Sequence, residues 1–314
     1  MLFKRISKKL LVATIALIVI ALVYFFPNGS DEEVYEQNIS YIEANKNPIY
    51  LKDNNNYIAR TNIIMKETET EEKVKEIIES LTINSSKKDY IPNGFSALIP
   101  EGTKVLSLDF DGSLLKINFD SNFKSITLQD EEAVIESLVY SLTEINSIKK
   151  IMIFIDGELL TRLPNSNKKL PHYLTRDYGI NKIYDLNTLS DCTITTIYYL
   201  SKFNEQYYYV PVTTFSNNPS NKIEIVINNL KGNSIYNPNL LSYMVNSVEL
   251  LSYELEESKA SLNFNSYIFD NFDDKTISEE VKYTILLSLK DSMGISEVVL
   301  KVNDEEIDKL SIES

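Results

Sequence analysis

The sequence predicts an α+β protein built from two small domains of similar fold in tandem. Residues 131–160 align with residues 278–307 without a gap at a constant offset of 147. Upstream, residues 105–121 align with residues 250–266 at an offset of 145. Because apolar positions coincide along both alignments, we expect two units of roughly 100 residues each and not one large fold.

Each copy is expected to open with a strand and an amphipathic helix. The strands are predicted near residues 57–64 and 208–215. Apolar residues at i, i+3, i+4 and i+7 predict the helices that follow. They are Val74, Ile77, Ile78 and Leu81 in the first copy, and Ile223, Val226, Ile227 and Leu230 in the second. A period that occurs twice is stronger evidence for a helix than either window alone.

A hairpin, a second helix and a buried strand complete each copy. In the first copy the hairpin strands are expected at 105–110 and 115–119, the second of them with clean apolar alternation. The helix is expected over about 131–142, and its apolar face recurs in the second copy at Val281, Ile285, Leu286 and Leu289. The strand 151–155 is continuously apolar, which indicates a central position covered on both faces.

The resulting order, β-α-β-β-α-β, describes a small α/β sandwich with helices packed on a mixed sheet. Residues 27–48 are polar and acidic and are interpreted as a stalk. The first domain is placed at 49–163 and the second at 196–314. The turn-rich segment between them, 164–195, is either a linker or the tail of the first domain.

The N-terminal segment has the pattern of a membrane anchor. Basic residues in segment 1–9, which is expected in the cytoplasm, precede an uncharged apolar run over residues 10–26. A helix of that length spans about 25 Å, close to the ~30 Å hydrocarbon core, so 10–26 is predicted to be a single transmembrane helix with the bulk of the chain outside the cytoplasm. A cleavable signal peptide is the competing interpretation, but the apolar residues 22–26 that follow the candidate cleavage triplet 19–21 favour an uncleaved anchor.

The charge of the chain beyond the anchor argues against nucleic acid as a partner. All 45 acidic residues lie there, against 27 basic ones once the four in the N-terminal segment are removed from 31, so the net charge is near −18. Such a charge repels phosphate polymers and anionic headgroups. The single cysteine, Cys192, cannot form an intrachain disulfide, and stability is therefore expected to come from packing.

No catalytic, cofactor-binding or metal-binding residue is predicted. His172 is the only histidine and Cys192 the only cysteine, so the sequence has almost none of the residues that a Ser-His-Asp or Cys-His site requires. The acidic loop 270–274 has Phe272 where a calcium loop needs an oxygen ligand, and it is interpreted as a lead into a helix capped by Asp or Ser. Asp109 and Asp111 are expected to face solvent at a strand edge.

Several short motifs occur in a fixed order along the first copy. Ile99-Pro100-x-Gly102 precedes a strand, Asn118-Phe119-Asp120-Ser121 ends a hairpin, Ser141-Leu142-Thr143 lies on a helix, and Asp156-Gly157-Glu158 ends the apolar strand. This combination resembles the GerMN domain of sporulation and spore-germination proteins. Residues 174–181 resemble the segment that often follows this domain. The second copy keeps Ser288-Leu289 but replaces Asp-Gly by Asn303-Asp304, so it is expected to be a divergent GerMN-like domain.

The resemblance implies an extracytoplasmic, non-catalytic domain similar to the ring-building motifs of secretion-type assemblies. We therefore expect a membrane-anchored scaffold in sporulation or germination, whose partner is an extracytoplasmic membrane or cell-envelope protein complex, with self-association as a further option. The tyrosine-rich strand 207–209 is the candidate contact surface. The alternative is a cell-envelope hydrolase acting on peptidoglycan or a germinant, or a ligand-binding accessory protein.

Overall fold

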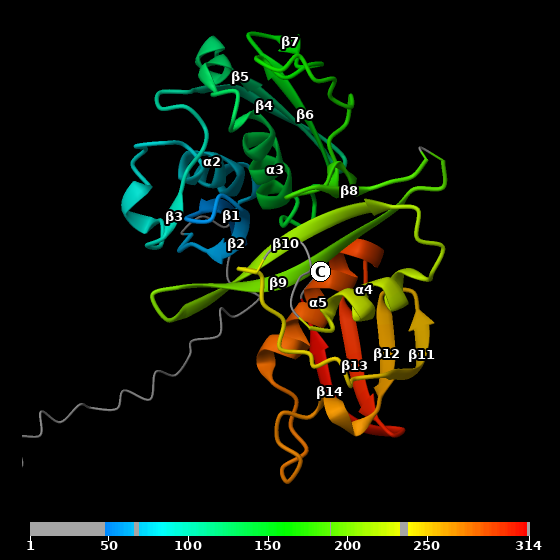
Figure 1. Cartoon of the computed structure of the whole chain (residues 1–314). Coiled ribbons are helices and arrows are strands. Elements are labelled where there is room, and N and C mark those ends of the chain that lie inside the picture. The colour runs from blue at the N-terminus through cyan, green and yellow to red at the C-terminus, as the bar shows by residue number, and fades with distance from the viewer. Residues whose placement is uncertain (1–47, 66–68, 189, 233–237, 313–314) are drawn as a thin grey trace, which may run out of the picture. The chain divides into compact units, whose positions relative to one another are not determined.

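The computed structural model describes residues 48–65, 69–188, 190–232 and 238–312 (Figure 1). The predicted cytoplasmic segment, the predicted anchor 10–26 and nearly all of the predicted stalk lie outside these residues. Within the described residues, no helix is long and apolar enough to cross a membrane.

The two halves of the described chain repeat one order of elements: a hairpin, a helix, a second hairpin, a second helix and two strands. In the first half these are β1 Pro48–Asp53, β2 Ile58–Asn62, α2 Thr70–Ser80, β4 Val105–Asp111, β5 Leu114–Phe119, α3 Glu131–Leu142, β6 Lys150–Ile155 and β7 Glu158–Leu159, with the two-residue strand β3 Phe95–Ser96 between α2 and β4. The predicted tandem α+β architecture is therefore confirmed.

The second half follows a short connecting strand, β8 Ile183–Asp185. Its elements are β9 Thr193–Phe203, β10 Gln206–Ser216, α4 Lys222–Leu230, β11 Leu250–Glu256, β12 Lys259–Phe264, α5 Glu279–Met293, β13 Glu297–Val302 and β14 Glu305–Ser311. Short 3₁₀ helices lie at Lys88–Tyr90, Ser121–Ser125, Arg176–Tyr178 and Ser266–Ile268. The strands expected near 57–64 and 208–215 are each the second strand of a hairpin, and their partners β1 and β9 were not predicted.

The strands of the described residues form three sheets, one in each half and one shared. The first half contains β4-β5-β6-β7 and the second contains β11-β12-β13-β14, each with a parallel central pair and antiparallel outer pairs. The shared sheet has the order β3-β1-β2-β10-β8, with β9 also paired to β10. Its two hairpins meet where β2 pairs with β10 at Arg60 and Tyr209. The single mixed sheet predicted for each domain is thus divided, and the opening hairpins join the domains.

Local sequence signals define the ends of α5, which confirms the predicted cap. The Ser278 hydroxyl accepts a hydrogen bond from the Val281 amide (3.3 Å). Glu279 and Glu280 in the first turn interact favourably with the positive end of the helix dipole. Gly294 ends the helix in the left-handed conformation, with φ 74°. The helix packs against β9, as α3 packs against β1 and β2 (Figure 1).

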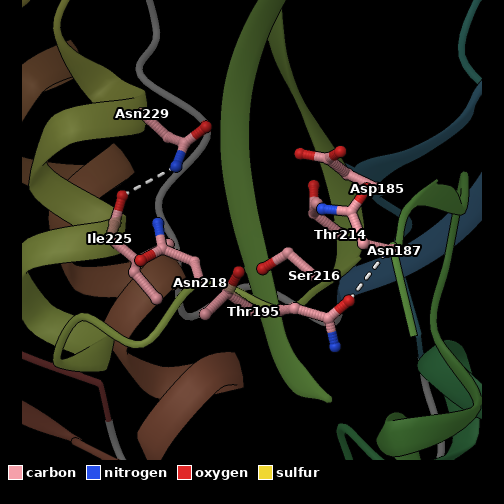
Figure 2. Close-up of a pocket in the computed structure, with 9 residues that line it drawn as sticks. Asp185, Asn187, Thr195, Thr214, Ser216, Asn218, Ile225 and Asn229 are labelled. Atoms are coloured by element: carbon pink, nitrogen blue, oxygen red, sulfur yellow. Dashed lines mark hydrogen bonds between the residues drawn. The ribbon is translucent and has the colours of Figure 1, made fainter. Parts of the chain in front are cut away.

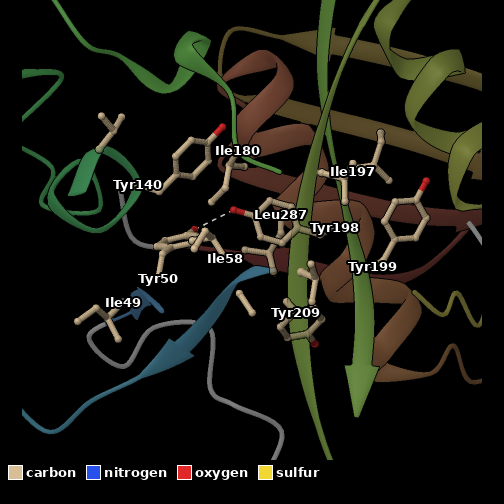
Figure 3. Packing of buried hydrophobic residues seen from close by; sticks show 14 of the residues in the cluster. Ile49, Tyr50, Ile58, Tyr140, Ile180, Ile197, Tyr198, Tyr199, Tyr209 and Leu287 are labelled. Atoms are coloured by element: carbon tan, nitrogen blue, oxygen red, sulfur yellow. Dashed lines mark hydrogen bonds between the residues drawn. The ribbon is translucent and has the colours of Figure 1, made fainter. Parts of the chain in front are cut away.

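A continuous apolar core runs through both halves. Side chains from β1, β2 and α3 pack toward those from β9, β10 and α5, as Figure 3 shows for Tyr50, Tyr140, Tyr198 and Leu287. Tyr50, Tyr140 and Tyr198 are fully buried. The Tyr50 and Tyr140 rings pack edge to face, with 5.4 Å between their centroids. Buried tyrosines bring hydroxyl groups into the core, and these groups require partners.

A buried polar cluster as the candidate functional site

Equivalent residues of the two halves build equivalent polar contacts. Tyr50 in β1 and Tyr198 in β9 each donate a backbone N–H to a serine hydroxyl on the second helix of their half, Ser141 and Ser288, at 2.9 Å in both cases. These serines are separated by the offset of 147 found in the sequence. The duplication therefore preserves a contact between the first strand and the second helix of each domain.

The tyrosine hydroxyls then donate to acidic groups at the ends of these helices. Tyr50 Oη lies 2.7 Å from Glu144 Oε1, and Tyr198 Oη lies 2.5 Å from Asp291 Oδ2. The two hydroxyls also contact each other, with 2.8 Å between their oxygens. Since Glu144 and Asp291 again lie 147 residues apart, the two copies of one arrangement face each other across the domain junction.

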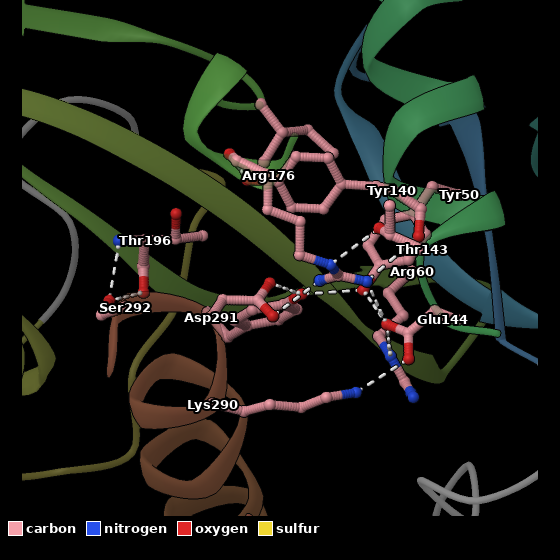
Figure 4. Close-up of polar contacts among 12 residues, drawn as sticks. Tyr50, Arg60, Tyr140, Thr143, Glu144, Arg176, Thr196, Lys290, Asp291 and Ser292 are labelled. Atoms are coloured by element: carbon pink, nitrogen blue, oxygen red, sulfur yellow. Dashed lines mark hydrogen bonds and ion pairs between the residues drawn. The ribbon is translucent and has the colours of Figure 1, made fainter. Parts of the chain in front are cut away.

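One arginine from the segment between the domains bridges both acids (Figure 4). Arg176 Nη2 lies 2.7 Å from Glu144 Oε1, and Nη1 lies 2.6 Å from Asp291 Oδ1. Its Nε donates to Thr143 Oγ1 at 3.0 Å, and Nη2 also donates to the Tyr140 carbonyl at 3.1 Å. The planar, forked guanidinium suits this role because it can donate to several acceptors at once.

Two further cations and a ring complete the cluster. Lys290 Nζ from α5 lies 2.8 Å from Glu144 Oε2, which adds a second ion pair between the halves, and Arg60 Nε lies 4.0 Å from Glu144 Oε1. The Arg176 guanidinium stacks over the Tyr140 ring, 4.7 Å from its centroid. We call Tyr50, Arg60, Tyr140, Glu144, Arg176, Tyr198, Lys290 and Asp291 the junction cluster.

The electrostatics of the junction cluster follow from burial and charge pairing. Burial alone would raise the pKa of Glu144, but Arg176, Lys290 and Arg60 hold that pKa well below its usual range. Burial opposes the charged form of Arg176, yet the carboxylates of Asp291 and Glu144 hold its pKa well above the ordinary value. Burial, reinforced by the Asp291 charge, raises the pKa of Tyr198. At neutral pH the cluster is therefore an ion network with protonated tyrosines.

Asn181 closes the seam between β2 and β10 beside the junction cluster. Its Nδ2 donates to the carbonyls of Ile58 (2.8 Å) and Pro211 (2.7 Å), and its Oδ1 accepts from the Ile58 amide (2.9 Å). Its own N–H donates to Glu136 Oε2 at 2.8 Å. The residue adopts φ 48°, a conformation that asparagine tolerates better than most side chains. One side chain thus replaces ladder hydrogen bonds that the two strands do not form.

The residues singled out from the sequence do not converge on a catalytic arrangement. His172 and Cys192 are exposed, and Asp109 and Asp111 face solvent on β4 as expected, with Lys116 Nζ 2.9 Å from Asp109 Oδ2. In the described part of the chain, no group of three or more His, Cys, Asp or Glu side chains could hold a metal ion.

The tyrosine-rich strand 207–209 does not form the exposed contact surface that the sequence suggested. Tyr208 and Tyr209 are each 3% exposed, because β10 lies in the middle of the shared sheet. Tyr208 Oη donates to Asp53 Oδ2 at 2.8 Å, and its ring packs on Phe95 at 4.9 Å. These tyrosines contact the other half of the same chain, so the prediction of an external surface there is wrong.

A polar hollow of about 340 Å³ lies beside the C-terminal end of β10 (Figure 2). Its lining is dominated by side-chain amides and hydroxyls, with one carboxylate: Asp185, Asn187, Thr195, Thr214, Ser216, Asn217, Asn218, Ile225 and Asn229. Such groups can hydrogen-bond a neutral polar molecule, but this lining offers no pair of carboxylates for acid–base catalysis.

Comparison with known proteins places this geometry in context. The family model described as "Germane: Sporulation and spore germination" matches residues 48–161 and 196–308. The spore germination protein GerM of Bacillus subtilis (strain 168) is 31% identical over 261 residues, which cover 81% of this chain and 70% of that protein. The solved structure of the tandem GerMN domains of the sporulation protein GerM from Bacillus subtilis superposes with a TM-score of 0.76 at 29% identity, covering 85% of this chain and 96% of that one.

Proposed function

Because this chain belongs to the Germane family of sporulation and spore germination proteins, we propose that it is a non-enzymatic assembly protein whose two domains act as one unit. The observation that carries the proposal is the junction cluster. Ion pairs of 2.6–2.8 Å tie α5, the connecting segment and the residues that follow α3 together. Tyr50 on β1 and Tyr198 on β9 hydrogen-bond to the same acids. A module with a fixed domain arrangement can present surfaces from both domains to a partner at a defined spacing.

The proposal includes an anchor and a location. Residues 10–26 would hold the chain in the cell membrane as a single-pass helix with its N-terminus in the cytoplasm, and the two domains would lie outside the cytoplasm. The partner would be an extracytoplasmic membrane or cell-envelope protein complex. The support for this arrangement is the basic cluster that precedes the apolar run, together with the acidic charge of the remainder of the chain.

Complementation of a strain that lacks the gene tests the proposal. The full chain should restore heat-resistant spores or their germination, and Arg176→Met in the junction cluster should reduce that rescue. Asp185→Asn in the polar hollow and Asp109→Asn on β4 should rescue as well as the unaltered chain. A hydrolase would give the reverse pattern: loss of rescue on removal of a single carboxylate, together with peptidoglycan cleavage by the purified chain. Normal spore formation and germination without the gene would overturn the proposed function.

The anchor is tested separately by fractionation. The full chain should sediment with membranes and stay there in high salt, and replacing residues 10–26 by a polar linker should release it. Recovery of the unaltered chain in the soluble fraction, shortened at its N-terminus, would instead establish the cleaved signal peptide.

A further inference from the structure

The edge strands β4 and β11 carry the same chemistry at the same positions. Their sequences, Val-Leu-Ser-Leu-Asp-Phe-Asp and Leu-Leu-Ser-Tyr-Glu-Leu-Glu, agree in side-chain class along almost their whole length. Both strands are exposed at the same five of seven positions. Exposed positions tolerate most substitutions with little effect on stability, so packing does not explain this agreement.

The neighbouring strands of the same hairpins have diverged at comparable positions. Lys116 on β5 corresponds to Ser261 on β12, and Leu114 corresponds to Lys259. The irregularity in the β4–β5 ladder at Leu106 recurs in the β11–β12 ladder at Leu251. Agreement in side-chain class at exposed positions therefore distinguishes β4 and β11 from the neighbouring strands of their hairpins.

Among the residues that the structure describes, both strands are paired on one side only. β4 ends the sheet β4-β5-β6-β7, and β11 ends the sheet β11-β12-β13-β14. An edge strand presents backbone N–H and C=O groups that can pair with a further strand. Beyond the irregularity, pairing with the inner strand is regular from Ser107 to Asp111 and from Ser252 to Glu256, which leaves a regular stretch of each edge available to a partner.

The two faces of each edge have different chemistry. Phe110 lies opposite the buried Leu115, and Leu255 lies opposite the buried Ala260, so both point to the face that the helices cover. They remain 37% and 44% exposed. The acids Asp109 and Glu254 point to the other face. A strand added here would find apolar neighbours on one face and carboxylates on the other.

We propose that β4 and β11 are docking edges for an extended segment of a partner protein in which apolar residues alternate with Lys or Arg. This deepens the proposed assembly function and rests on it, since it names the class of partner. Alternation of the two residue types would place apolar side chains beside Phe110 and Leu255 and cations beside the acids.

Charge complementarity selects this partner over a second copy of the chain. Pairing of two such edges would bring carboxylates next to carboxylates, on a chain whose net charge is already −14. The acids also protect each edge from chance pairing with other strands, but protection does not explain exposed leucine and phenylalanine side chains. β11 is the stronger edge, because Glu254 and Glu256 form no ion pair with the described residues, whereas Lys116 pairs with Asp109 on β4.

The test uses the full chain in detergent micelles and a synthetic peptide of alternating Lys and Val, as long as the edge strand. Binding should slow hydrogen exchange of the backbone amides in 250–256, and more weakly in 105–111. A peptide with Glu in place of Lys, and one with the Lys and Val residues segregated into blocks, should give no protection. Equal protection by either control, or protection confined to other segments, would overturn the proposal.

A matched pair of variants separates strand addition from general attraction to an acidic protein. Glu254→Lys on β11 should weaken peptide binding about fivefold, because an attractive cross-strand pair becomes repulsive. Glu257→Lys makes the same change of charge in the adjoining turn, off the strand, and should leave binding unchanged. Equal weakening by both variants would overturn the docking edge.

Two further outcomes would contradict the docking edges in different ways. Protection of 250–256 that grows with protein concentration in the absence of peptide would mean that the edge pairs with a second copy, which contradicts a basic partner. Absence of peptide binding, combined with loss of spores in the deletion strain, would overturn the docking edges and leave the proposed assembly function standing.

Discussion

Arg176→Met is the substitution that bears most directly on the junction cluster. It keeps most of the side-chain length and apolar volume but removes the guanidinium that bridges Glu144 and Asp291 at 2.7 and 2.6 Å. Glu144 keeps Lys290 at 2.8 Å, whereas Asp291, whose side chain is 2% exposed, loses its only ion-pair partner among the described residues. The main cost is therefore a buried carboxylate left without a cation.

The magnitude follows from the behaviour of broken buried pairs. Removing one partner of a buried ion pair costs about 3–5 kcal/mol, because the remaining charge is desolvated and unpaired. Folded domains are stable by about 5–15 kcal/mol, so the variant should lose a large part of its free energy of unfolding. The two domains should also unfold in separate transitions, because the cluster is a principal polar link between them.

Urea denaturation followed by tyrosine fluorescence measures both effects, since the chain has 20 tyrosines and no tryptophan. Arg162→Met is the matched control: it is the same substitution near the end of the first domain, at an exposed arginine whose Nη1 donates to the Asn167 carbonyl at 2.9 Å. It should leave the midpoint unchanged. A midpoint for Arg176→Met within error of that control would refute the reasoning.

Three further expectations concern single groups. Tyr198→Phe removes the donor to Asp291 and should lower the free energy of unfolding by about 1–3 kcal/mol in the same urea assay, whereas Tyr173→Phe, at a tyrosine that is 52% exposed, should not change it. The folded-state pKa of Glu144 is held below its unfolded value, so ionised Glu144 stabilises the fold above about pH 4, and this stabilisation is lost as the pH falls through the folded-state pKa. Glu144→Gln should therefore lower the free energy of unfolding at pH 7 and have no such effect in acid. An effect of the substitution that does not depend on pH would contradict the ion network. Asn181→Gly removes the side chain without strain at φ 48° and should speed hydrogen exchange of the Ile58 amide, and unchanged exchange there would mean that Asn181 does not close the seam.

Hydrophobic periodicity is sufficient to predict the second helix and the second hairpin of each half. The apolar faces of α3 and α5 recur at a constant offset, and burial of those faces is what a period of 3.6 residues reports. The sequence does not predict strand β9, because its N-terminal part lies at the end of the turn-rich segment, although its β-branched and aromatic residues are typical of a strand. Strand β1 is short and begins with proline, which weakens any signal from the sequence.

The junction cluster could not be predicted by the same route. Residue type alone does not show whether an arginine or a glutamate is buried, and Arg176 lies in a segment without hydrophobic periodicity. A usable signal was nevertheless present: Ser141 and Glu144 recur as Ser288 and Asp291 at the offset of the apolar frame. Polar residues retained at such an offset on the inner side of a helix indicate a buried contact, even when the partner is unknown.

The central claim is that the junction cluster holds the two domains as one unit, and a distance distribution tests it most directly. Spin labels at Lys124→Cys and Ser258→Cys, both exposed, would report the separation of the domains in a Cys192→Ser background. The full chain should give one narrow distribution, which should broaden with Arg176→Met and stay narrow with Arg162→Met. A broad distance distribution in the chain with an unaltered junction cluster would contradict the claim. A narrow distribution that Arg176→Met leaves unchanged would contradict it as well.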